Sequence, residues 1–314
     1  MNINYFDMLT YRRKEGSKGQ QVFNRKYLRP VFGKPDANGN YTLIIGDRPK
    51  VAFMAHHDTV HKKTDKAQVY VDNGVVYSDG TDVLGADCTT GIYLILRMIE
   101  AQVPGVYVVH AAEEIGCLGS MAIVDQQPDW FDHVDFAISF DRKGYSEIIT
   151  HQCGIRTCSD LFAESLADVL GLDMKPSNQG VYTDSNEYRG VIPECTNISV
   201  GYFKQHTIKE YQDLDFLDLL EDAVINADWS KLVKNRTPTM GGALSGYNDL
   251  DDWSYPYYNT NGHFKGHGNK KEELVDVVKQ YPEQVAAILR TFGYSPDGLR
   301  DDCLAIRKPY DTYV

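Results

Sequence analysis

Histidines and carboxylates that could bind metal ions recur at one kind of position in this sequence. Four of them come just past the carboxyl end of an apolar run, and a fifth precedes a helical pattern: His56, Glu114, Asp141 and His206, and then Asp87. Isolated carboxylates at the rim of a core are costly unless they are paired or bound to a metal ion. Two histidines with three carboxylates are ligands that zinc and similar divalent ions prefer. The sequence therefore indicates a metal site.

The apolar runs that precede these residues have the length and composition of buried strands. We expect strands over Tyr41–Ile45, Val51–Ala55, Val106–Ala111, Phe136–Phe140 and Asn197–Phe203. Apolar residues at helical spacing predict helices over Gly91–Ala101, Ser159–Leu170 and Leu214–Ile225. Strands that alternate with helices predict a three-layer αβα sandwich with a mixed, mostly parallel central sheet. In such sheets ligands bind at the carboxyl ends of the strands, where the candidate ligands fall.

The composition changes near residue 230, so we expect a catalytic domain over residues 1–230 and an appendage over residues 231–314. The polar N-terminal stretch predicts a helix or two, up to the turn Gly33–Gly39. The stretch Arg236–Gly268 is rich in Gly, Asn, Tyr, Asp and Pro without periodicity, which predicts a long loop or lid. Beyond it, Leu274–Phe292 carries two apolar faces around Pro282, which predicts a helical pair that packs on the main domain or a partner.

Charge and composition argue against several classes of protein. The formal net charge of −12, with 44 acids against 32 bases, disfavours a nucleic-acid binder, because phosphate contacts call for a basic face. No run approaches the about 18 apolar residues of a membrane span, and the first residues lack a signal-peptide core, so no membrane partner is expected. Six scattered cysteines suit neither a disulfide framework nor a CxxC pair. Reduced thiols in a cytoplasmic protein are the simplest interpretation.

The motifs together resemble those of the co-catalytic zinc aminopeptidases, the lid-less branch of the zinc exopeptidase superfamily. More distantly they resemble the tripeptidases, aminoacylases and glutamate carboxypeptidases. The resemblance covers residues 45–225 and rests on Ala55-His56-His57-Asp58, Gly85-Ala86-Asp87, the run Glu113–Ser120, Phe140-Asp141-Arg142, Thr183-Asp184-Ser185, Gly190–Pro193, His206-Thr207 and Glu210. The combination is specific, although no single motif would be.

The resemblance implies a centre with two zinc ions, in which manganese or cobalt could replace zinc. Asp87 would bridge the two ions. His56 and Asp141 would complete one site, and Glu114 and His206 would complete the other. Two ions about 3.5–4 Å apart lower the pKa of a shared water to ~7 and polarise the scissile carbonyl.

Two further carboxylates receive roles from the same resemblance. Asp58 would orient the imidazole of His56, and Glu113 would be the general base that takes a proton from the attacking water. The chain departs from the family at Cys88, where many relatives carry a second acid or an Asn. The neighbouring His57 and His61 are expected to support the site or to lie at the surface, without binding metal.

The resemblance implies hydrolysis of a peptide or small amide. Only a helix and a loop are expected between the Asp141 strand and His206, which leaves no room for the lid or dimerisation domain of the carboxypeptidase and aminoacylase branch. We therefore expect an aminopeptidase. The rival enzyme is a deacylase or carboxypeptidase acting on a small N-acyl substrate, and the rival from another class is an inactive binding module of the same fold. The sequence specifies neither the oligomeric state nor the preferred side chain.

Overall fold

The computed structural model describes residues 3–238, together with residues 278, 279, 282, 285 and 286. The largest sheet in this part of the chain has seven strands in the order β1-β5-β2-β6-β11-β7-β10. They are β1 (Tyr41–Ile45), β2 (Val51–His56), β5 (Gly105–His110), β6 (Phe136–Arg142), β7 (Glu147–Ile149), β10 (Lys175–Ser177) and β11 (Glu194–Ser199). Strands β5, β2, β6 and β11 are parallel, whereas β1 runs antiparallel to β5, and β7 antiparallel to β11. The predicted mixed, mostly parallel sheet is confirmed.

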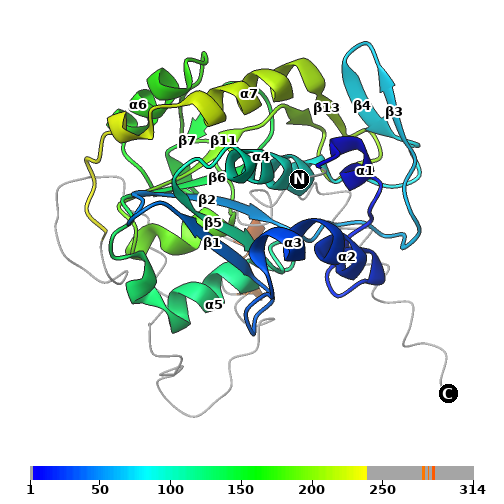
Figure 1. Cartoon of the computed structure of the whole chain (residues 1–314), viewed down its shortest axis with the longest axis horizontal. Helices are drawn as coiled ribbons and strands as arrows, with labels where there is room; N and C mark the ends of the chain where they lie inside the picture. The colour runs from blue at the N-terminus through cyan, green and yellow to red at the C-terminus, as the bar shows by residue number, and fades with distance from the viewer. Residues whose placement is uncertain (1–2, 239–277, 280–281, 283–284, 287–314) are drawn as a thin grey trace. The chain divides into compact units, whose positions relative to one another are not determined.

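Helices cover both faces of this sheet (Figure 1). One face packs against α1 (Tyr5–Leu9), α4 (Ala86–Glu100), α6 (Asp160–Leu170) and α7 (Leu214–Asn226). The other packs against α5 (Leu118–Gln126) and the 3-10 helices η2 (Pro128–Phe131) and η3 (Asp184–Gly190). Successive residues of β2 alternate between the two cores, with Phe53 in the first and Met54 in the second, because strand side chains point to opposite faces. The predicted αβα sandwich is therefore confirmed.

Helix α4 approaches the sheet closely at Gly91. A Cβ atom built there would lie 2.4 Å from Phe140 O of β6 and 3.0 Å from Ala55 Cβ of β2. Only glycine fits without displacing the helix. The helix begins at Ala86, ahead of the predicted start at Gly91, so its first turn was missed by the apolar pattern.

The N-terminal stretch forms three short helices and one π-helical segment: α1, α2 (Lys18–Phe23), η1 (Asn24–Leu28, π) and α3 (Arg29–Phe32). The side chain of Ser17 accepts a hydrogen bond from the backbone N–H of Gln20 and so caps α2. Met8, Phe23 and Leu28 are fully buried in the core that α4 shares. The N-terminal segment therefore packs on the large sheet through the core that α4 shares, and it has more helical segments than predicted.

A second, four-stranded sheet was not predicted. It has the order β12-β13-β4-β3 and consists of β3 (Val69–Asp72), β4 (Val75–Ser78), β12 (Tyr202–Phe203) and β13 (Tyr211–Asp213). The expectation of one strand over Asn197–Phe203 is wrong, because β11 spans Glu194–Ser199 and the chain then turns onto the second sheet at β12. Gly201, with φ 87°, lies at this turn, where an added Cβ would meet Phe216 at 2.6 Å. A small hairpin, β8 (His151–Gln152) with β9 (Ile155–Arg156), completes the strands described.

The chain that follows α7 returns to the sheet as far as the structure describes it. Trp229, in the 3-10 helix η4 (Trp229–Lys231), packs edge-on against Phe53 with ring centroids 4.8 Å apart. The backbone N–H groups of Asn235 and Arg236 each donate to Glu194 Oε1 at 2.8 Å. The predicted loop from residue 239 onwards lies outside the described residues, as does the helical pair over Leu274–Phe292 apart from the five isolated positions. No described helix is long and apolar enough to cross a membrane.

Candidate metal centre

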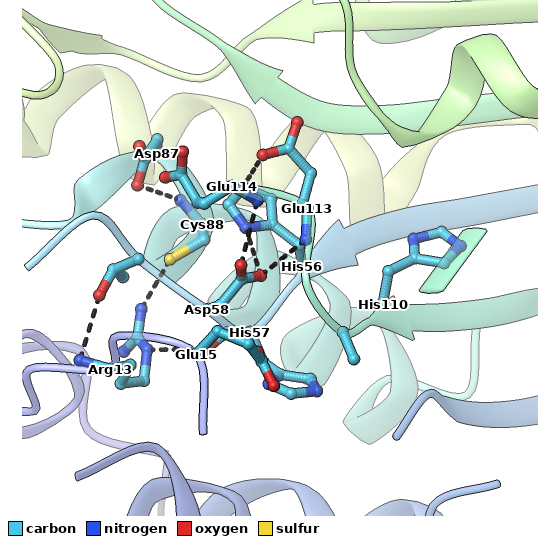
Figure 2. A network of polar contacts seen from close by, with 12 residues as sticks. Arg13, Glu15, His56, His57, Asp58, Asp87, Cys88, His110, Glu113 and Glu114 are labelled. Atoms are coloured by element: carbon cyan, nitrogen blue, oxygen red, sulfur yellow. Dashed lines mark hydrogen bonds and ion pairs between the residues drawn. The ribbon is translucent and has the colours of Figure 1, made fainter. Parts of the chain in front are cut away.

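The candidate ligands converge from separate elements at one edge of the large sheet. His56 is the last residue of β2, and Asp141 lies next to the last residue of β6. Glu114 follows the end of β5, and Asp87 occupies the first turn of α4. Figure 2 shows His56, Asp87, Glu113 and Glu114 pointing toward one another. The parallel strands thus bring together residues that are far apart in the sequence.

One cluster consists of Asp87, Glu114 and His206, whose ligand atoms all lie within 4.8 Å of one another. His206 Nε2 lies 3.0 Å from Asp87 Oδ2 and 3.3 Å from Glu114 Oε1. Asp87 and Glu114 are almost buried, whereas about half of the His206 side chain, 49%, is exposed. This cluster has one open side.

A second cluster consists of His56, Glu113 and Glu114, so that Glu114 belongs to both clusters. His56 Nε2 lies 3.6 Å from Asp141 Oδ1 and 4.0 Å from Glu113 Oε2. The other oxygen of Asp141 accepts a hydrogen bond from Thr183 Oγ1 at 2.8 Å, which leaves Oδ1 facing the histidine. Glu113, the predicted base, belongs to this cluster, whereas the predicted ligand Asp141 lies beside His56 but in neither cluster.

Asp58 lies beneath both clusters and is fully buried. Its Oδ1 accepts the backbone N–H of Glu113 at 3.1 Å, and its Oδ2 accepts that of Glu114 at 3.0 Å. Its Oδ1 also lies 3.4 Å from His56 Nδ1. Burial raises the pKa of Asp58, but the hydrogen bond with His56 and the charge of this histidine outweigh it, so the pKa is lowered. A charged Asp58 therefore holds His56, Glu113 and Glu114 in one arrangement.

Glu210 holds the start of α4 from a distant part of the chain. Its carboxylate accepts the backbone N–H groups of Leu84 at 2.9 Å, Gly85 at 3.1 Å and Ala86 at 2.8 Å. These N–H groups have no partner within the helix, and the two carboxyl oxygens of Glu210 satisfy them. Glu210 therefore positions the turn that carries Asp87.

Four residues near the candidate ligands adopt left-handed backbone conformations without being glycine. Ala112 has φ 58° and Cys117 has φ 55°, on either side of Glu113 and Glu114, and Lys204 has φ 56° close to His206, which itself has φ 61°. Each such conformation costs of order 1–3 kcal/mol and persists only where the surrounding structure imposes it. Strain of this kind clusters at functional sites.

Crowding of carboxylates dominates the electrostatics of the site. Burial raises the pKa of Glu113 well above its usual value, and repulsion from Asp141 and Glu114 adds to this effect. Burial also raises the pKa of Glu114 to about 7. For His206, burial lowers the pKa, but hydrogen bonds to Asp87 and Glu114 outweigh it and raise the pKa to about 11. The crowded carboxylates of the site therefore stabilise a positively charged group placed among them, such as protonated His206.

The structure places the remaining sequence candidates away from the ligand atoms. The ring of His57 turns toward the N-terminal helices, where Nε2 lies 3.2 Å from Gly39 O (Figure 2). His61 Nδ1 lies 2.6 Å from Thr59 Oγ1. Neither histidine belongs to either cluster. The buried Cys117, in contrast, lies with its Sγ 3.8 Å from Glu113 Oε1.

Sequence reasoning missed a buried polar network beside the site. His110, the last residue of β5, lies between Tyr188 Oη, 2.7 Å from its Nε2, and Asp184 Oδ2, 3.1 Å from its Nδ1. Ser120 Oγ donates to the other oxygen of Asp184 at 2.6 Å. The signal was present, because His110 ends an apolar strand as His56 does, but nothing local distinguishes it from a core histidine.

No protein-family model matches this sequence, and no curated protein matches it. Among solved structures, aminopeptidase PepT from Bacillus cereus aligns with a TM-score of 0.57 at 14% identity, covering 71% of this chain and 95% of its own. A tripeptidase from Staphylococcus aureus aligns with a TM-score of 0.57 at 16% identity, with coverages of 71% and 95%. The TET1 peptidase of Pyrococcus horikoshii aligns with a TM-score of 0.55 at 14% identity, with coverages of 71% and 98%.

At these identities the likeness concerns the fold. The shared fold has a mixed, mostly parallel sheet with helices on its faces. This chain has the fold of aminopeptidase and tripeptidase structures, as its resemblance to the zinc exopeptidase superfamily implied.

Proposed function

We propose that this protein is a metalloaminopeptidase that uses two zinc ions to hydrolyse the amide bond after the free amino terminus of a peptide. The observation that carries the proposal is the convergence of two ligand clusters on the shared Glu114, with Glu113 Oε2 4.0 Å from His56 Nε2. Manganese or cobalt could take the place of zinc, since the ligands are nitrogen and carboxylate oxygen.

The residues fit divalent cations by donor type and by burial. Glu114 Oε1 is buried, and the polar atom that faces it is His206 Nε2, at 3.3 Å. Its other neighbours include carboxylates whose mutual repulsion a cation would relieve. In the proposal Asp87 would bind both ions, His56 and Asp141 would hold one, and Glu114 and His206 would hold the other, while Glu114 also lies beside His56. When bound, the ions would polarise the scissile carbonyl and make a water molecule acidic near neutral pH.

Glu113 is proposed as the general base. Its carboxylate takes the proton of the attacking water and then delivers it to the leaving amine, a contribution of about 10²–10⁴-fold in rate. Its side chain is 12% exposed, so substrate and water can reach it although it is largely shielded. The N–H groups of Glu113 and Glu114 bind the same carboxylate of Asp58, which fixes the base and a ligand relative to each other.

The chain between Asp141 and His206 supports an aminopeptidase over a deacylase. This segment contains short strands, α6 and η3, and no inserted domain. Two of the similar structures are an aminopeptidase and a tripeptidase by name. The deacylase remains the second candidate because the same site could hydrolyse a small N-acyl amide.

Glu113→Gln and Glu114→Gln test the roles of the two adjacent acids. We expect wild type to bind two zinc ions by elemental analysis and to cleave aminoacyl-anilides but not their N-acetyl forms. Glu113→Gln should keep both ions and lose at least about 10²-fold in kcat, whereas Glu114→Gln should lose metal. Glu221→Gln, on α7 and paired with Arg97, is the control. Absence of metal in reconstituted wild type, or equal metal loss in both variants, would contradict the assignment. Cleavage of only the N-acetyl forms would favour the deacylase.

A further inference from the structure

Arg13 is a fully buried cation. Within residues 3–238 no carboxylate lies at ion-pair distance from its guanidinium, whereas the equally buried Arg12 pairs with Asp65, Asp79 and Asp82. Burying an unpaired charge costs several kcal/mol. Such a group is retained only where its contacts offset that cost, so the contacts of Arg13 indicate what it does.

One set of contacts binds Arg13 to the segment that follows His56. Its Nε donates to His57 O at 3.2 Å. Its backbone N–H donates to Thr59 Oγ1 at 3.1 Å, and the backbone N–H of Thr59 donates back to Arg13 O at 3.0 Å. These three bonds flank Asp58, the carboxylate that touches His56, and therefore hold the end of β2 and its extension against Arg13.

A second set binds Arg13 to the first turn of α4. Its Nη2 lies 2.7 Å from Cys88 Sγ and donates to Thr89 Oγ1 at 2.6 Å. Cys88 follows the proposed bridging ligand Asp87 directly. Figure 2 shows the guanidinium of Arg13 bonded to Cys88 on the side opposite the ligand cluster.

The guanidinium is itself fixed by two further contacts. Its Nη1 donates to Met8 O at 3.3 Å, and its Cζ lies 4.2 Å from the centre of the Phe23 ring. A cation over an aromatic face is stabilised, and a planar fork with several donors can bind two segments at once. A lysine would keep the two backbone bonds to Thr59, but its single ammonium cannot replace the guanidinium bonds to both the segment after His56 and the first turn of α4.

We propose that Arg13 is a positioning residue of the metal centre. It sets the separation of His56 and Asp87, because it bonds both to the segment that follows His56 and to the helical turn that carries Asp87. The inference rests on the proposed metal site. It gives the N-terminal segment a role in the metal centre. The sequence does not indicate this role, because Arg13 and Cys88 are 75 residues apart.

Zinc affinity of the apo protein, measured by competition with a chromophoric chelator, tests this role. Arg13→Lys keeps the positive charge but replaces the several N–H donors of the guanidinium by one ammonium group. Thr89→Val removes one hydrogen-bond acceptor of Arg13 Nη2. Changes to groups that orient metal ligands typically weaken binding by about 10–100-fold, and we expect losses in this range for both variants. The matched control is Thr90→Val, on the same turn, whose hydroxyl binds Tyr5 and Gln212 and not Arg13.

Two readouts separate positioning from general stability. Urea unfolding of the apo proteins should show similar losses for Thr89→Val and Thr90→Val. The visible absorption spectrum of the cobalt-loaded protein should change in Thr89→Val and Arg13→Lys and stay unchanged in Thr90→Val. The inference would be overturned if Thr89→Val and Arg13→Lys kept the zinc affinity and the cobalt spectrum of wild type, or if Thr90→Val changed both as much as they do. The proposed function would stand in either case. A wild type that binds no zinc would overturn both.

Discussion

Replacing Asp58 by asparagine should separate the stability of this fold from its metal affinity. In the native protein the two oxygens of Asp58 accept the N–H groups of Glu113 and Glu114, and Oδ1 lies 3.4 Å from His56 Nδ1. Asparagine keeps one acceptor oxygen. Its NH₂ group must face the backbone N–H of either Glu113 or Glu114, so at least one buried donor loses its partner.

The expected cost follows from these contacts. A hydrogen bond to a charged group contributes about 1.5–3 kcal/mol, so Asp58→Asn should lower the free energy of unfolding by about that amount. In a protein of this size the melting temperature should fall by roughly 2–4 °C per kcal/mol. Metal affinity should fall by about 10–100-fold, because the variant disturbs the orientation of His56, Glu113 and Glu114 together.

Asp82→Asn is the matched control. Asp82 is almost buried and its Oδ2 accepts the N–H groups of two consecutive residues, Lys62 at 3.0 Å and Lys63 at 2.8 Å, but it touches no candidate ligand. Thermal unfolding of the two metal-free variants should give similar losses. Zinc titration by calorimetry should show weakened binding only for Asp58→Asn.

The pH dependence of the unfolding free energy of the two variants tests whether folding lowers the pKa of each aspartate. Burial raises the pKa of both Asp58 and Asp82, but hydrogen bonds outweigh it, so folding lowers both pKa values. Their stabilisation is present above the unfolded pKa of about 3.9 and is lost as the pH falls through the folded value. The stability gap between wild type and each variant should therefore shrink below about pH 4. Wild-type zinc affinity in Asp58→Asn, or equal loss in Asp82→Asn, would refute the reasoning.

Three further expectations follow from the structure. Gly91→Ala should destabilise the protein by about 1–3 kcal/mol in urea unfolding and weaken metal binding, because the new methyl group meets Phe140 O at 2.4 Å; unchanged stability would be inconsistent with the close packing of α4. Asp184→Asn should cost about 1.5–3 kcal/mol, since it removes the negative charge that accepts a hydrogen bond from Ser120 Oγ and lies 3.1 Å from His110 Nδ1, and it should leave zinc stoichiometry unchanged in elemental analysis. Chelation should lower the melting temperature, by the equivalent of about 4 kcal/mol for metal previously at 1,000 times its Kd; an unchanged melting curve would argue against tight binding.

The central strands could be predicted because their signal is local. Strands β2 and β5 are buried along their whole length, which requires uninterrupted apolar runs in the sequence. The residues directly after such runs must lie at the sheet edge, so His56 and Glu114 could be placed there from the sequence. The second sheet escaped prediction because its strands are short, and β3 is largely exposed without an alternating pattern.

The beginning of α4 was missed for a different reason. Its first residues, Ala86-Asp87-Cys88-Thr89-Thr90, carry no apolar periodicity. The turn is held instead by Glu210, whose bond to Ala86 spans 124 residues of sequence. Helix ends depend on satisfied N–H groups, and here the partner is distant along the chain.

The sequence by itself determined the order of the strands along the chain, the apolar cores and the identity of the polar residues at the strand ends. These features can be predicted because hydrophobic periodicity is a local pattern that extends over only a few neighbouring residues. Only the tertiary structure decided that Asp58 also accepts the backbone N–H groups of Glu113 and Glu114, and that Arg13 bonds to Cys88. The physical reason is that a buried polar group is stable only with a partner in contact, and the fold alone brings such distant partners together.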